Sequence, residues 1–123
     1  MSIKVEKSEL ADAIKGRPYA YLLSPGRERP HVVQVVPALA DGVMYIDGPG
    51  RSAVGLAATY PSITLLYPPD EAEGYSLIVD GTAHPHGDDL HVCVDHAVLH
   101  RRATDTSEPS PTGCGADCHP VDI

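Results

Sequence analysis

A chain of 123 residues is long enough for one domain with a single core. Its formal net charge of -8 argues against nucleic acid or an anionic membrane surface as a partner, because both are bound through an excess of Lys and Arg. No apolar run approaches the roughly 20 residues of a membrane-spanning helix, and the N-terminus has no signal-peptide core, so we expect a cytoplasmic protein.

The first elements predicted along the chain are a short helix and a β-hairpin. Ser8 is a candidate helix cap, and Gly16 with Pro18 ends the helix, whose apolar residues on one face are Leu10, Ala13 and Ile14. Residues 19–23 and 31–36 are apolar and β-branched, and the polar stretch between them has the composition of a turn. These residues predict a packing helix followed by two antiparallel strands.

The second of these strands carries one unusual residue. Strand alternation places Val32, Gln34 and Val36 on one face, so Gln34 interrupts an otherwise apolar surface. A polar residue at such a position is often merely solvated near a barrel rim. The alternative is that Gln34 faces a ligand, and the sequence leaves both interpretations open.

A third strand, 43–46, leads into a Gly-Pro-Gly turn and a second helix that opens at Arg51 and Ser52 and stops at Pro61. A helix N-terminus that follows glycines offers free backbone N–H groups to an anion, and here it also carries a cation and a hydroxyl. Phosphate is the natural candidate, although an Arg at such a place is often only solvated. Small residues inside this helix would allow close packing against the sheet or against a flat ligand; they are Ala53, Gly55, Ala57 and Ala58.

Three further strands follow, at 62–67, 75–80 and from about residue 90. Gly81 indicates a bend or bulge, and residues 87–89 are typical of a hairpin turn. In the last strand the apolar side chains change parity at Asp95 and His96, which predicts a bulge or a change of strand partner. Apolar residues of both parities in these strands exceed what one small barrel interior needs, so we expect a homodimer; they are Ile63, Leu65, Leu66, Leu77 and Ile78.

Several of these segments together resemble a known family. GPGRSA, YPSITLLYPP, GYSLIVDGTA and AVLHR are similar to the small actinobacterial branch of the pyridoxamine 5'-phosphate oxidase-like split-barrel flavoproteins, from about Leu10 to Arg101. The resemblance implies a mainly β fold, a six-stranded antiparallel split β-barrel with short flanking helices, spanning residues 1–103. It also implies a homodimer with FMN, or in some branches a deazaflavin coenzyme, at the subunit interface. It does not imply pyridoxamine phosphate as the substrate.

The resemblance further assigns cofactor contacts. Gly50, Arg51 and Ser52 would hold the phosphate. Gln34, Val35, Val36 and Tyr67 would meet the ring, with core or dimer packing as the alternative for Tyr67, and His100 and Arg101 would reach the cofactor across the dimer. The expected function is a flavin-dependent oxidoreductase acting on a small molecule, because flavin chemistry needs little acid–base apparatus from the protein. The alternative is a flavin- or ligand-binding dimer without turnover that stores or senses the cofactor.

Two clusters of metal-ligand residues remain. His84, His86, His91 and His96 lie near Cys93, Asp88 and Asp89, but a polar hairpin tip explains them as well, and we predict no metal site there. The Pro- and Ser-rich tail, 104–123, carries Cys114, Cys118 and His119 at a spacing that fits neither c-type haem attachment nor a common zinc site. A metal, a redox pair and a loose tail with free thiols all stay open for it.

Overall fold

The computed structural model describes residues 2–102 of the chain. The tail, with Cys114, Cys118 and His119, lies outside the described residues, as does the predicted domain boundary at residue 103.

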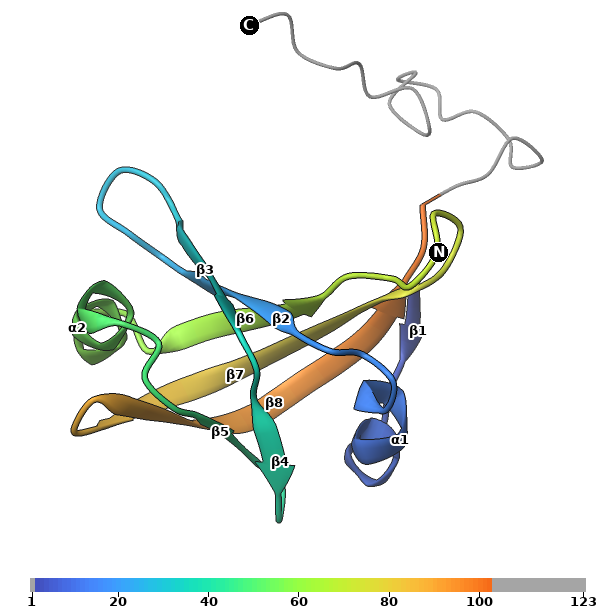
Figure 1. Ribbon diagram of the computed structural model, residues 1–123, viewed down its shortest axis with the longest axis horizontal. Coiled ribbons are helices and arrows are strands. Elements are labelled where there is room, and N and C mark those ends of the chain that lie inside the picture. Colours follow the sequence, from blue (N-terminus) through green and yellow to red (C-terminus); the bar gives the residue numbers. More distant parts are fainter. Residues whose placement is uncertain (1, 103–123) are drawn as a thin grey trace, which may run out of the picture.

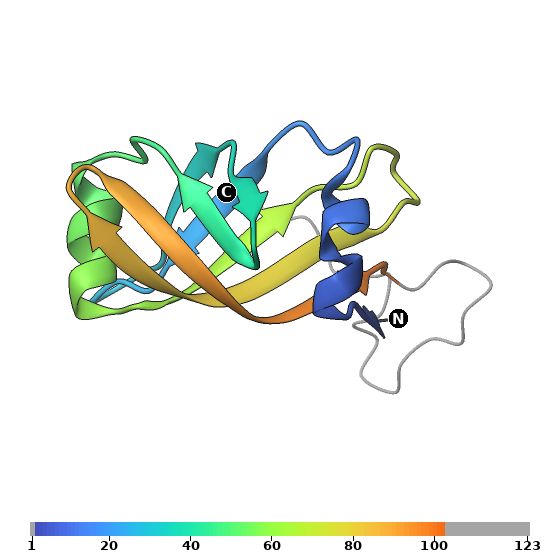
Figure 2. The ribbon, with the colours of Figure 1, turned by 90° about the horizontal axis from the view of Figure 1, so that it is seen from below.

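The structure is one curled, fully antiparallel sheet with two short helices at its ends (Figures 1 and 2). The strands are β1 (Ser2–Lys4), β2 (Ala20–Ser24), β3 (His31–Val35), β4 (Ala38–Ala40), β5 (Val43–Ile46), β6 (Ser62–Tyr67), β7 (Ser76–His86) and β8 (Asp89–His100). Seven of them follow the order β3-β2-β6-β7-β8-β5-β4, and β1 pairs with the end of β8.

The predicted number of six strands is wrong, because β1 and β4 are additional. Each has three residues, too few to show an alternation of side chains, and each is recognisable only by its backbone pairing. β1 pairs with Val98–His100, and β4 folds back on β5 through a turn in which Asp41 and Gly42 both have positive φ angles.

The N-terminal helix is shorter than predicted and is capped differently. A 3-10 turn η1 (Lys7–Glu9) precedes α1 (Leu10–Ile14), and the side chain of Glu9 accepts a hydrogen bond from the backbone N–H of Glu6 at 3.2 Å. Glu6 and Glu9 form a capping box, so the prediction that Ser8 caps the helix is wrong. Leu10 is buried, with Ala13 and Ile14 packed against the core, as the apolar face predicted.

The bulge predicted at Asp95 is confirmed. Asp80 pairs with His96 and Gly81 pairs with Val94, so Asp95 is the extra residue in β8. Gly81 is required at this point, because a Cβ atom there would lie 2.5 Å from Cγ1 of Val92 and 2.7 Å from the carbonyl oxygen of Cys93. The bulge bends the long β7–β8 hairpin and helps the sheet to curl.

The core fills the concave side of the curled sheet. Its members include Leu22, Met44, Leu65, Leu77 and Val92, each 0% exposed. Helix α2 (Arg51–Thr59) lies at one end of the β7–β8 hairpin, next to the hairpin tip, while α1 and β1 lie at the other end (Figures 1 and 2). Ala53 and Ala57 are the buried residues of α2, so the predicted close packing of its small side chains is confirmed for these two.

Candidate functional site

The Gly-Pro-Gly turn delivers the chain into α2 with an open helix N-terminus. Gly48 and Gly50 have φ angles of 56° and 106°, a region that side chains with a Cβ rarely adopt. No side chain of residues 2–102 caps the helix, and the first intrahelical bond runs from the N–H of Val54 to the carbonyl of Gly50 at 3.1 Å. The N–H groups of the first turn are therefore available to an anion.

Arg51 lies in a groove of about 580 Å³ beside this N-terminus, which we call the Arg51 groove. It is lined by Gly48, Gly50, Arg51, Val54, Gly55 and Asp88. A hydrogen bond of 2.8 Å from the Gly48 N–H to a carboxylate oxygen of Asp89 fixes the turn against the β7–β8 hairpin tip. Arg51 and Asp88 place opposite charges in the groove, so Asp88 opposes the attraction of Arg51 for an anion.

A second groove, of about 630 Å³, lies between α2 and the start of β3, and we call it the His31 groove. Its lining residues are Arg29, Pro30, His31, Val32, Ser52, Gly55 and Leu56. Consecutive helix residues point about 100° apart, so Ser52 lines this groove while Arg51 lines the other. Gly55 lines both grooves, and a Cβ atom there would have no neighbour within 4 Å. Gly55 therefore leaves bare helix backbone between the two grooves.

The residues predicted on β3 are split between its two faces. Gln34 and Val36 point outward, and Val36 is 72% exposed. Val35 points into the core and is 6% exposed, so only its backbone is available to a ligand. β3 is an edge strand, and its first two residues, His31 and Val32, line the groove beside α2.

Tyr67 belongs to the core and not to a rim. It is 1% exposed, and burial raises the pKa of its hydroxyl to about 12. This placement corrects its assignment as a ring-facing residue and agrees with core packing as the alternative. Its hydroxyl oxygen has no hydrogen-bond partner within residues 2–102.

β1 lies at the opposite end of the sheet from α2 (Figure 1), and His100, which precedes Arg101, pairs with Ser2 of β1. The ring of His100 is 3.2 Å from the hydroxyl of Ser2, and the guanidinium of Arg101 lies 4.7 Å from the ring centre of Tyr75. β8 has 12 residues, so the 11 steps from Asp89 at the hairpin tip to His100 span up to about 36 Å at about 3.3 Å per step. One chain alone therefore does not bring these two residues to the Arg51 groove.

Two histidines of the β7–β8 hairpin contact each other through their rings. His86 stacks on His91 with 3.8 Å between ring centres, and Tyr45 meets His91 edge-on at 4.7 Å. Between Ser2 and Arg102, no group of three or more His, Cys, Asp or Glu side chains is placed to hold a metal ion.

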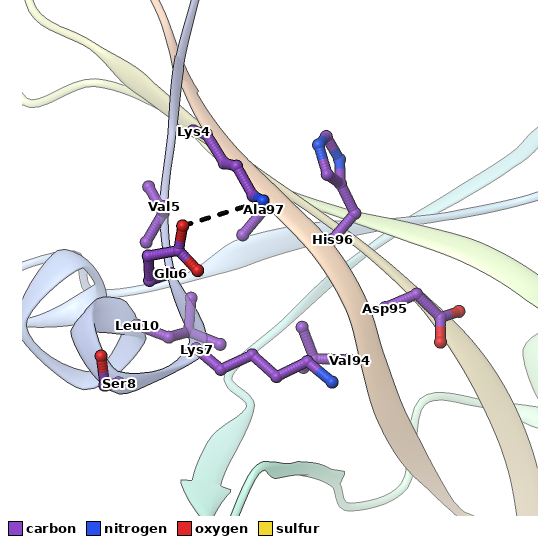
Figure 3. Close-up of a pocket in the computed structure, with 10 residues that line it drawn as sticks. All are labelled: Lys4, Val5, Glu6, Lys7, Ser8, Leu10, Val94, Asp95, His96 and Ala97. Atoms are coloured by element: carbon purple, nitrogen blue, oxygen red, sulfur yellow. Dashed lines mark ion pairs between the residues drawn. The ribbon is translucent and has the colours of Figure 1, made fainter.

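A third cavity, of about 370 Å³, lies between η1 and the bulge of β8 (Figure 3). Charges of both signs line it, and one pair is already made, between Lys4 and Glu6 at 3.7 Å. Asp95 is held by the Thr82 hydroxyl at 2.9 Å. This cavity has no excess of positive charge and no open helix N-terminus, so it suits a phosphate less well than the Arg51 groove.

No family model matches the chain. Two curated relatives do: "Uncharacterized protein Mb0449c" of Mycobacterium bovis and "Uncharacterized protein MT0457" of Mycobacterium tuberculosis. Each is 37% identical over 133 residues, covering 94% of this chain and 93% of the relative.

Among solved structures, the chain is similar to a FAD-binding protein of Mesorhizobium loti, with a TM-score of 0.62, 12% identity and coverage of 80% of this chain and 96% of that one. It is also similar to the FAD-binding protein of Mycobacterium smegmatis, with a TM-score of 0.61, 15% identity and coverage of 82% and 100%. A candidate pyridoxamine 5'-phosphate oxidase of Listeria innocua gives a TM-score of 0.58, 10% identity and coverage of 73% and 92%. The chain belongs to the family of the two mycobacterial proteins, and its fold is the pyridoxamine 5'-phosphate oxidase-like split barrel.

Within this split barrel, most lining residues of the His31 groove were not predicted from the sequence, among them Arg29, Pro30 and His31. Arg29 and Pro30 belong to a stretch that has the composition of an ordinary polar turn, and His31 is the first residue of a strand. No local pattern distinguishes them, because their proximity to α2 depends on the curl of the sheet. In the part of the chain that the structure describes, no helix is long and apolar enough to cross a membrane.

Proposed function

We propose that this split barrel binds a flavin, with FMN the expected form, and acts as a flavin-dependent oxidoreductase on a small organic molecule. The observation that carries the proposal is the position of Arg51, which lies in an open groove at an uncapped helix N-terminus. A cation beside free N–H groups is the usual protein arrangement for holding a phosphate. The names of the Mesorhizobium loti and Mycobacterium smegmatis structures, both FAD-binding proteins, support a flavin as the ligand class.

The position of the two grooves supports the proposal of a flavin as well. They meet at Gly55, where no side chain separates them, so a phosphate at Arg51 and a flat ring system beside Val32 and Leu56 can belong to one ligand. Val32 is 55% exposed and offers an apolar surface to a ring. A bound flavin would supply the hydride and electron transfer chemistry, while the chain supplies binding and orientation. A deazaflavin coenzyme or FAD, which carry phosphates too, would use the same Arg51 contact.

A cytoplasmic location stays a prediction.

The proposed active form is a homodimer. Leu66 and Ile78 face away from the core and are only half-buried, and their cross-strand neighbours Tyr21 and Val98 extend this surface over four strands. A partner subunit would cover these side chains. It is also the means by which His100 and Arg101 could approach the Arg51 groove, since they lie far from it within one chain.

The test is a titration of the purified full-length protein with FMN, followed by absorbance and flavin fluorescence. We expect saturable binding that Arg51→Ala weakens about tenfold, because a charge-assisted phosphate contact in an open groove lies at the low end of its range. Lys15→Ala removes an exposed positive charge beside α1 and is the matched control. Bleaching of bound FMN by NADPH and reoxidation by an acceptor would support the oxidoreductase. Binding without any such turnover would favour the carrier or sensor instead.

A further inference from the structure

The His31 groove contains an imidazole whose two nitrogens have different surroundings. His31 lines the groove, and its Nδ1 is enclosed and has no hydrogen-bond partner within residues 2–102. Nε2 is not among the buried atoms without a partner, and the side chain of His31 makes no hydrogen bond within residues 2–102, so Nε2 is the ring nitrogen accessible to a ligand. Enclosing a polar atom without a hydrogen-bond partner costs free energy, so we expect Nδ1 to find a partner among its neighbours.

A second atom of the same kind lies next to it. The hydroxyl of Ser24 also lacks a partner in the described part of the chain, and Ser24 is 1% exposed. Ser24 and His31 are directly opposite each other in the β2–β3 pair, so their Cβ atoms are about 5 Å apart on the same face. Three side-chain atoms between Ser2 and Arg102 are enclosed without a partner, and two of them are these neighbours.

The chemistry of the two groups is complementary. A serine hydroxyl can donate one hydrogen bond, and a neutral imidazole has one nitrogen that accepts and one that donates. The partner of one ring nitrogen decides which nitrogen carries the proton. A rotation of the Ser24 side chain would bring its hydroxyl within reach of Nδ1 and would leave the proton of the ring on Nε2.

We propose that Ser24 donates a hydrogen bond to Nδ1 of His31, and that His31 in turn donates from Nε2 to a hydrogen-bond-accepting edge of a planar ligand in the His31 groove. This inference rests on the proposed function, under which the ligand is the ring system of the flavin. Ser24 is a positioning residue and His31 is the residue that touches the ligand. Val32 and Leu56 give the groove apolar surface for a flat ring, and Arg29 adds a positive charge that favours a ligand edge carrying negative charge.

The tautomer of His31 can be measured directly by ¹⁵N NMR of the imidazole in the full-length protein. We expect the proton on Nε2 in the wild type and a mixture of tautomers in Ser24→Ala, a change that loss of packing alone does not produce. In FMN titrations, His31→Phe should weaken binding about tenfold and Ser24→Ala about threefold, as for one hydrogen bond lost or left unoriented. His31→Gln keeps a donor and should recover part of the loss. His84→Phe, a change of the same size at an exposed strand position, is the control.

The outcomes separate this inference from the function beneath it. A wild-type protein that binds no flavin overturns both. Flavin binding that His31→Phe and Ser24→Ala leave unchanged overturns the inference and leaves the proposed function standing. A proton on Nδ1 in the wild type also overturns the inference, and this measurement needs no variant to fold.

Discussion

Gly55 offers a test that separates stability from ligand binding. It lies in the middle of α2, where glycine destabilises a helix by about 1 kcal/mol relative to alanine or leucine. A Cβ atom at this position would meet no other atom of residues 2–102 within 4 Å, so the first carbon of a larger side chain fits without a clash. Gly55→Leu should therefore stabilise the fold by up to about 1 kcal/mol, which for a domain of about 100 residues raises Tm by about 4 °C.

The side chain introduced by Gly55→Leu should also block the binding of the flavin. It would project where the Arg51 groove and the His31 groove meet, at the point where a bound ring has to approach the helix backbone. Inserting several methylene-sized groups into a fitted contact costs about 1 to 3 kcal/mol, so FMN affinity should fall by about fivefold to about 150-fold. Gly55→Ala should give a similar gain in Tm with a smaller loss of affinity.

Thermal unfolding and FMN titration of the same preparations check both effects. Ala58→Leu is the matched control, because Ala58 is exposed on the same helix and lines neither groove. A Gly55→Leu protein that is as stable as expected and binds FMN as tightly as the wild type would show that the ligand does not cross α2 at Gly55.

Three further outcomes are expected. Asp88→Asn should strengthen FMN binding about threefold at low salt, because it removes the negative charge that shares the groove with Arg51. In titrations at rising ionic strength this gain should shrink. An unchanged affinity at low salt would place the phosphate outside the Arg51 groove. Gly81→Ala should lower the free energy of unfolding by about 1 to 3 kcal/mol, measured by urea denaturation, since its Cβ would collide with β8; a smaller change would mean that the bulge relaxes easily. Leu66→Asp should convert the proposed dimer into a monomer in light scattering, whereas a wild-type monomer at micromolar concentration would refute the dimer itself.

The sequence predicts strands and bulges well wherever apolar and polar side chains alternate clearly. Asp95 shows this most clearly, because the change of parity in β8 is a direct consequence of the extra residue in the ladder. The hairpin of β2 and β3 and the strands β5 and β6 follow from alternation and turn residues in the same way. Three-residue strands such as Ala38–Ala40 carry too little pattern, and they exist because a neighbouring backbone is available.

The candidate site is less predictable, because it is assembled from segments that are distant in sequence. Arg51 and Gly50 could be identified from the glycines before a helix, a local signal. The pairing of Ser24 with His31 depends on strand register, and the approach of His31 to α2 depends on the curl of the sheet. The misplacement of Tyr67 has a related cause, since alternation gives its face but not whether that face is the core.

Equilibrium dialysis of the wild-type protein against FMN tests the central claim most directly, because it measures both affinity and stoichiometry without assuming any activity. We predict uptake that saturates at one FMN per chain and that falls on Arg51→Ala but not on Lys15→Ala. The absence of any uptake of FMN, FAD or a deazaflavin coenzyme by the folded wild-type protein would contradict the proposal.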